Sequence, residues 1–160
     1  MKNSFKTRLI FTMVVLLSLG LTACGLNNKS KDKVVNYTKE EVNVFQKTPE
    51  TIIKTYYADA LPLYQSAEPD EKGLSRLYSL IKICVANTDK SEEVYVTQVK
   101  NNIIKTFKTY GKLLDYKISE PVKNLDGSTK ITVVEQYEKR DLTSVFNLKK
   151  ENDLWYIYKK

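Results

Sequence analysis

The chain of 160 residues is predicted to form an α+β domain in which N-terminal helices pack on a curved antiparallel sheet of about four strands. Three observations support this fold class. Apolar residues recur at helical spacing between residues 48 and 110, the period changes to two after Gly111, and polar turn residues separate the later apolar runs. The length favours a single folded domain.

The first helix is expected to begin at Thr48-Pro49-Glu50, where threonine is an N-cap, proline occupies the first position and an acid lies in the first turn. Pro62 is expected to stop or bend this helix. Its apolar stripe comprises Ile52, Ile53, Tyr56, Tyr57 and Ala60.

Two further helices are expected before Gly111. One begins near Pro69-Asp70, and the other begins at the N-cap Ser91 and ends at Gly111. The buried face of the first comprises Leu74, Leu77, Tyr78, Ile81 and Val85; that of the second comprises Val94, Tyr95, Val99, Ile103, Phe107 and Tyr110.

The remaining residues alternate between apolar and polar, as strands do. Asp126-Gly127 supplies a hairpin turn, and Glu151-Asn152-Asp153 supplies the last turn before a closing strand at residues 154–158. The inward positions are expected to be Leu114, Tyr116 and Ile118, then Ile131, Val133, Glu135 and Tyr137, then Leu142, Ser144, Phe146 and Leu148.

The N-terminus has the order of a secretory signal: basic MKNSFKTR, a 15-residue apolar stretch LIFTMVVLLSLGLTA, and then Cys24. The apolar stretch is shorter than the roughly 20 residues that a membrane-spanning helix needs. Leu21-Thr22-Ala23-Cys24 resembles the bacterial lipobox. This resemblance implies lipid attachment to the Cys24 thiol and cleavage between Ala23 and Cys24, so that residues 1–23 are a signal peptide.

The expected mature protein is therefore anchored to the cell membrane or the outer membrane, on the extracytoplasmic side. Residues 24–47 are interpreted as the lipidated cysteine and a polar tether, and residues 48–160 as the domain. Thr38 and Glu41 could instead form a capping box for a short helix within the tether.

Composition excludes several classes of site. There is no histidine, and Cys84 is the only cysteine after Cys24, so an internal disulfide or a zinc site of Cys and His cannot form. The net charge of +7 falls to +4 when the three basic residues of the signal are removed. Such a mild excess of positive charge favours contact with anionic lipid head groups or wall polymers. It is too diffuse to indicate nucleic-acid binding. No cofactor is expected beyond the covalent lipid at Cys24.

The segments TPETIIKTYYADAL and LKKENDLWYIYKK, the latter with Trp155 and Ile157, resemble small secreted lipoproteins of the cystatin-like, nuclear-transport-factor-two-like superfamily. The resemblance covers roughly residues 48–160. It implies a cone in which helices and a curved sheet can enclose a pocket; some members are isomerases or dehydratases and others only bind or assemble. The long segment from Pro62 to Lys90 and a last turn without glycine depart from the simplest pattern.

Glu135 is the one candidate for acid–base chemistry, because it has inward parity between Val133 and Tyr137. A buried carboxylate there could abstract a proton while a tyrosine hydroxyl stabilised the oxyanion. Alternatively, strand twist or a bulge turns Glu135 outward, or a lysine pairs with it. The candidate pocket residues are Glu135, Tyr137, Tyr57 and Trp155; no catalytic or metal-binding set is assigned.

The remaining tyrosines and Cys84 have two interpretations each. Seven tyrosines could line an amphipathic cavity or simply pack at the edge of the core: Tyr56, Tyr57, Tyr64, Tyr78, Tyr137, Tyr156 and Tyr158. Cys84 is interpreted as a small buried hydrophobic residue, because no histidine or helix start accompanies it as a reactive thiol would require.

We therefore expect a non-enzymatic, membrane-tethered binding or interaction module, with another envelope protein or a cell-wall polymer as its partner. The alternatives are a small-molecule binder or weak isomerase-like enzyme that uses the pocket, and a structural subunit that pairs through its exposed sheet.

Overall fold

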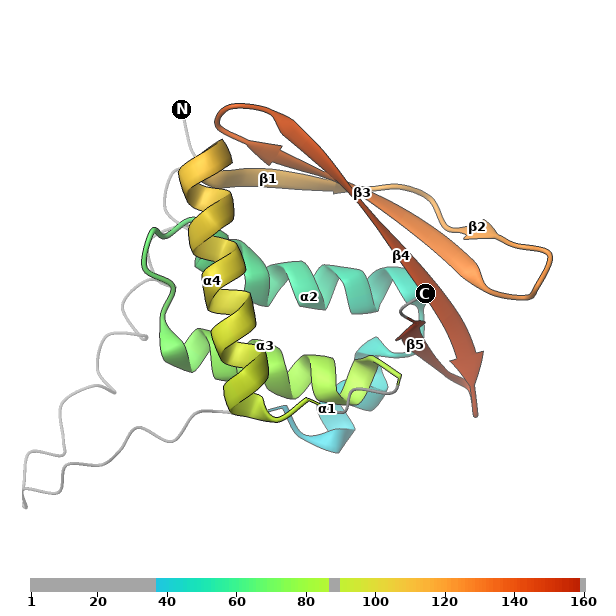
Figure 1. Ribbon diagram of the computed structural model, residues 1–160. Coiled ribbons are helices and arrows are strands. Elements are labelled where there is room, and N and C mark those ends of the chain that lie inside the picture. Colours follow the sequence, from blue (N-terminus) through green and yellow to red (C-terminus); the bar gives the residue numbers. More distant parts are fainter. Residues whose placement is uncertain (1–36, 87–89, 159–160) are drawn as a thin grey trace, which may run out of the picture. The chain divides into compact units, whose positions relative to one another are not determined.

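The computed structural model describes residues 37–86 and 90–158. The signal peptide, its cleavage site, Cys24 and residues 25–36 lie outside the described residues. Four helices precede an antiparallel sheet, which confirms the α+β class (Figure 1). The elements are α1 (Lys39–Phe45), α2 (Pro49–Tyr64), α3 (Glu71–Cys84), α4 (Glu92–Tyr110), β1 (Leu113–Ile118), β2 (Val122–Lys123), β3 (Thr129–Tyr137), β4 (Asp141–Glu151) and β5 (Leu154–Tyr158).

The sheet has five strands in the described part of the chain, against an expectation of about four. Its order is β1-β3-β4-β5, and the two-residue strand β2 pairs with β3 beyond the end of β1. The last turn needs no glycine, because Asn152 and Asp153 both adopt positive φ, at 48° and 66°. The helices lie on one face of the sheet (Figure 1).

The predicted helix starts at Thr48, Asp70 and Ser91 are confirmed, because each side chain accepts a hydrogen bond from a backbone N–H of the first turn. The expectation that Pro62 stops α2 is corrected, because α2 continues through Pro62 to Tyr64. Proline costs the helix one hydrogen bond, and here it lies in the last turn with its ring exposed to solvent.

The folded domain also begins before the expected boundary at residue 48. The capping box of Thr38 and Glu41 is present, and α1 buries Val42 and Phe45 in the core. Gln46 holds α1 against β5: its side-chain amide donates to the Trp155 carbonyl at 2.9 Å, and its own carbonyl accepts from the Trp155 N–H at 2.8 Å. Residues 38–47 are therefore part of the domain and not of a tether.

The predicted face of β3 is confirmed, since Ile131 and Val133 are fully buried and Tyr137 is 6% exposed. The parity of β1 is corrected at one position. A β-bulge between Leu113 and Asp115 places Leu113 in the core and leaves Leu114 exposed. Tyr116 and Ile118 pack on the core as expected.

The hydrophobic core lies between the helices and the inner face of the sheet. Its helical side includes Ile52, Ile53, Leu74, Leu77 and Ile103, and its sheet side includes Ile131, Val133 and Leu148. Within residues 37–86 and 90–158, no helix combines the length and the apolar composition that crossing a bilayer requires.

Candidate functional site

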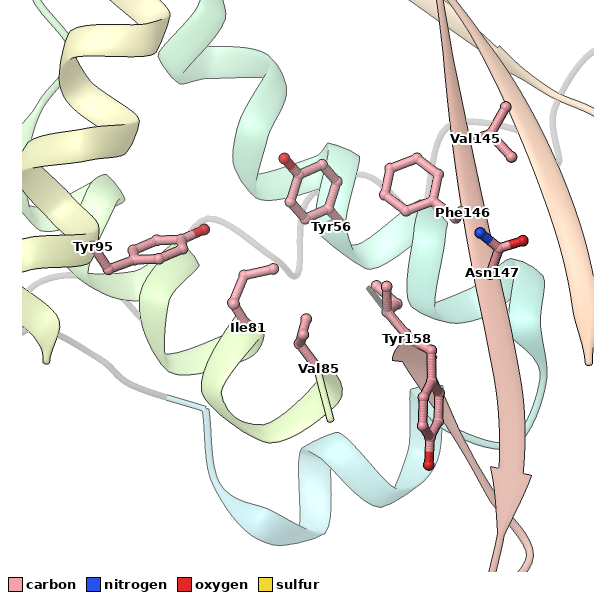
Figure 2. A pocket seen from close by; sticks show the side chains of 9 residues that line it. Tyr56, Ile81, Val85, Tyr95, Val145, Phe146, Asn147 and Tyr158 are labelled. Carbon is pink, nitrogen blue, oxygen red and sulfur yellow. The ribbon is translucent and has the colours of Figure 1, made fainter. Parts of the chain in front are cut away.

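A cavity of about 540 Å³ lies where α2, α3 and the start of α4 face strands β4 and β5 (Figure 2). This volume is in the range of ordinary small-molecule pockets. Figure 2 shows Ile81, Val85 and Tyr95 on the helical side, with Tyr56 and Phe146 side by side. The described lining comprises Tyr56, Ile81, Val85, Tyr95, Val145, Phe146, Asn147, Ile157 and Tyr158.

The lining is aromatic and aliphatic, and among the described residues it contains no acidic or basic side chain. Its lining residues carry the hydroxyls of Tyr56, Tyr95 and Tyr158 and the amide of Asn147, of which the Tyr158 hydroxyl donates to Glu151, a residue outside the lining. Taking a charge into such a site without a partner is costly, whereas an uncharged group can hydrogen-bond to hydroxyls and an amide. The cavity is therefore suited to an uncharged, largely apolar group.

The cavity extends around the edge of the sheet. Phe146 and Ile157 belong to the inner face, whereas Val145, Asn147 and Tyr158 alternate with them and belong to the outer face. The cavity is therefore lined by residues from both faces of the sheet at β4 and β5.

Next to the cavity, Glu135 projects inward and is surrounded by hydroxyl groups. The Tyr57 hydroxyl donates to Glu135 Oε1, and Ser144 Oγ lies 3.0 Å from the same oxygen. The Tyr137 hydroxyl lies 3.4 Å from Oε2. Strand twist does not turn Glu135 outward, and no lysine among the described residues forms an ion pair with it.

Burial keeps the tyrosines of this cluster protonated. It raises the pKa of Tyr57 far above its ordinary value, and the hydrogen bond to Glu135 raises it further. Burial also raises the pKa of Tyr137, followed by the charge of Glu135, and raises that of Tyr56. These phenols therefore act as hydrogen-bond donors and not as phenolate nucleophiles near neutral pH.

Tyr56 separates the Glu135 cluster from the cavity. Its ring lies 5.2 Å from that of Tyr57 and 5.8 Å from that of Phe146, centroid to centroid. Neither Glu135 nor Tyr57 lines the cavity. The Glu135 carboxylate therefore holds the Tyr57 hydroxyl, and the Tyr57 ring packs on the cavity residue Tyr56.

Of the four candidate pocket residues, the structure brings together Glu135, Tyr57 and Tyr137 but not Trp155. Glu135 pairs with Leu142 and Trp155 with Lys150, positions that are eight residues apart on β4. Eight residues of strand span about 26 Å. Trp155 packs beside Gln46 and the core. None of the four residues is among the described residues that line the cavity; Glu135, Tyr57 and Tyr137 lie beside it.

The cavity residues Ile81, Val85, Tyr95 and Asn147 were not predicted as a site. The helical stripes identified the first three as buried, but no local signal indicates which helix ends meet β4. Cys84 is 1% exposed, and burial raises its pKa to about 12, so it is not a reactive thiol near neutral pH. Within the described chain, no group of three or more acids, cysteines or histidines is arranged to hold a metal ion.

No protein-family model and no curated protein matches the chain. Among solved structures, it is similar to a Campylobacter jejuni protein described as a "Putative NTF2-like transpeptidase". The two chains share 24% sequence identity with a TM-score of 0.46, over 71% of this chain and 99% of the other.

Proposed function

We propose that this chain is a bacterial lipoprotein, anchored through a lipid on Cys24, whose domain is a non-enzymatic binding module in the cell envelope. The basic start, the short apolar stretch and the sequence Leu21-Thr22-Ala23-Cys24 support the anchor. Cys24→Ala should abolish both incorporation of labelled fatty acid and cleavage before residue 24, so that the variant keeps its signal segment and runs as the longer precursor. Fatty-acid labelling of Cys24→Ala, or a wild-type chain that carries no lipid, would contradict the proposal.

The cavity carries the binding function. It is large enough for a drug-sized molecule or an amino-acid side chain, it has an apolar lining, and its hydroxyl and amide groups can orient a bound group. The domain otherwise offers no assembled reactive centre among its described residues. Binding is the function that this geometry favours.

The surroundings of Glu135 favour a non-enzymatic role. Hydroxyl groups of Tyr57, Ser144 and Tyr137 surround its two carboxylate oxygens, and Tyr56 stands between it and the cavity. A general base must reach the proton that it abstracts. The inward position of Glu135 is nevertheless the one observation that favours an isomerase-like alternative, which requires Tyr56 to move. Turnover of a small carbonyl substrate that Glu135→Gln abolishes would establish that alternative.

The binding function can be tested by native mass spectrometry of residues 25–160, secreted and purified gently from the native host. We expect extra mass that leaves on denaturation. The variant Ile81→Trp should lose this mass by filling the cavity, whereas Leu125→Trp should retain it, because Leu125 is fully exposed. A bare monomer mass would show that the cavity holds no small ligand. Crosslinking in intact envelopes would then have to capture a protein partner at the residues that line the cavity. If neither method finds an occupant, the proposal is wrong.

A further inference from the structure

Three tyrosines line the cavity, and within the described chain their hydroxyls differ in hydrogen bonding. The Tyr158 hydroxyl donates to the Glu151 carboxylate. No residue of the described chain pairs with the hydroxyl of Tyr56 or of Tyr95. Every buried side-chain nitrogen or oxygen atom among the described residues does have a partner. The Tyr56 and Tyr95 oxygens are therefore not fully buried, and they face a space that water can enter.

The same two hydroxyls lie near each other and are proton donors. Tyr56 belongs to α2, and Tyr95 lies near the start of α4. Figure 2 shows the Tyr95 hydroxyl directed between Tyr56 and Ile81. Burial raises the pKa of Tyr56, and the neighbouring Tyr64 and Tyr95 raise it further. Burial also raises the pKa of Tyr95, so both phenols stay protonated near neutral pH.

Two such donors favour a ligand that brings an acceptor. A ligand that displaces water from the hydroxyls without accepting from them loses those hydrogen bonds, and its affinity falls. A carbonyl oxygen has two lone pairs, so it can accept both bonds, and it brings no donor that would need a partner of its own. The apolar lining residues Ile81, Phe146 and Ile157 are available to the rest of the ligand.

We propose that the cavity binds a neutral, apolar molecule with a carbonyl group, as in esters, amides and ketones, and that Tyr56 and Tyr95 donate hydrogen bonds to the carbonyl oxygen. The ligand is uncharged, because the described lining holds no acidic or basic side chain to pair with a charge. This inference rests on the proposed function, in which the cavity is a binding site. The two hydroxyls thereby discriminate among apolar ligands of the same size.

The carbonyl group is bound here and not turned over. The Glu135 carboxylate accepts a hydrogen bond from Tyr57, and neither of these residues lines the cavity. The ring of Tyr56 lies between them and the bound group, with its centroid 5.2 Å from that of Tyr57. A general base would have to reach the ligand directly.

The test compares probes that share a naphthalene ring. They are the ketone 2-acetylnaphthalene, its isostere 2-isopropenylnaphthalene, in which a methylene group replaces the oxygen, and the anion 2-naphthoate. The mature chain in lipid nanodiscs is dialysed against empty nanodiscs at the same lipid concentration, so that partitioning of the probes into lipid cancels. Because water solvates the ketone more strongly than the alkene, the ratio of their two affinities is compared between each variant and the wild type.

The variants Tyr56→Phe and Tyr95→Phe each remove one hydroxyl and keep the ring. Each should lower the affinity for the ketone, relative to the alkene, by at least about fivefold. Tyr158→Phe is the matched comparison from the same lining. Because its hydroxyl already donates to Glu151, it should change both affinities by the same factor, within about twofold. A loss of packing alone would weaken both probes equally, and thermal melting verifies that each variant folds.

The outcomes separate the two proposals. If the ketone and the alkene bind and Ile81→Trp excludes both, yet neither Tyr56→Phe nor Tyr95→Phe alters the affinity ratio, the carbonyl inference is overturned and the proposed function stands. Binding of 2-naphthoate as tight as that of the ketone, or tighter, would overturn the assignment of a neutral ligand. If neither the ketone nor the alkene binds, the carbonyl inference is wrong. The proposed function then stands only if native mass spectrometry or crosslinking finds an occupant, and both proposals are overturned if neither does.

Discussion

Replacing Tyr57 with phenylalanine should destabilise the domain by removing one hydroxyl while keeping the ring. The ring is 2% exposed and stacks on Tyr116 with centroids 4.5 Å apart, so its packing is retained. The lost hydrogen bond has the Glu135 carboxylate as its acceptor. Hydrogen bonds to charged groups contribute about 1.5–3 kcal/mol. Because Glu135 is half-buried and keeps Ser144 and Tyr137, we expect a loss near the lower end, about 1.5 kcal/mol.

Urea denaturation at pH 7, followed by circular dichroism, measures this loss as a lower midpoint with an unchanged slope. Tyr78→Phe is the matched control: Tyr78 is 8% exposed, and its hydroxyl donates to the neutral Lys90 carbonyl at 3.1 Å. The control should lose about 0.5–1 kcal/mol. If Tyr57→Phe costs no more than Tyr78→Phe, the hydroxyl cluster does not stabilise a buried carboxylate.

Three further predictions concern burial. Because folding raises the pKa of several tyrosines, their contribution to stability is fully present below pH 10 and is lost as pH rises above it, by about 1.4 kcal/mol per pH unit for each. The urea midpoint should fall steadily from pH 10 to pH 11.5, and a constant midpoint would contradict the burial of Tyr56, Tyr57, Tyr64, Tyr95 and Tyr137. In residues 25–160, Cys84 should react with a thiol reagent at pH 8 only after unfolding, since its pKa is raised to about 12; rapid reaction of the native domain would refute this. Val42→Ala should cost about 2 kcal/mol in the same urea assay, because Val42 is fully buried; an unchanged midpoint would place α1 outside the cooperative fold.

Features that depend on local sequence were predictable. The N-caps Thr48 and Ser91 act within one helical turn, and the period-two pattern of β3 gave Glu135 inward parity. It left open whether strand twist turns that side chain outward. Features that depend on distant contacts were not. Gln46 pairs with Trp155, 109 residues away, and this contact incorporates α1 into the domain. The bulge that buries Leu113 arises from its pairing with Tyr137 across the sheet.

The cavity was unpredictable for a related reason. It depends on which residues of β5 lie beside which residues of β4, a register that follows from the turn at Asn152 and Asp153. Trp155 and Ile157 have the same parity, so the sequence pattern did not distinguish them. Only their position along the strand shows that Ile157 lines the cavity and Trp155 does not.

The early start of the fold at α1 limits how far the domain could lie from a lipid on Cys24. With a lipid on Cys24, thirteen residues connect the anchor to Tyr37, and a fully extended chain of that length reaches about 45 Å. A tether extending to residue 48 would have reached about 85 Å. A partner bound at the cavity would therefore have to come within about 45 Å, plus the width of the domain, of the lipid surface. This reach favours proteins resident at that surface over targets deeper in the envelope.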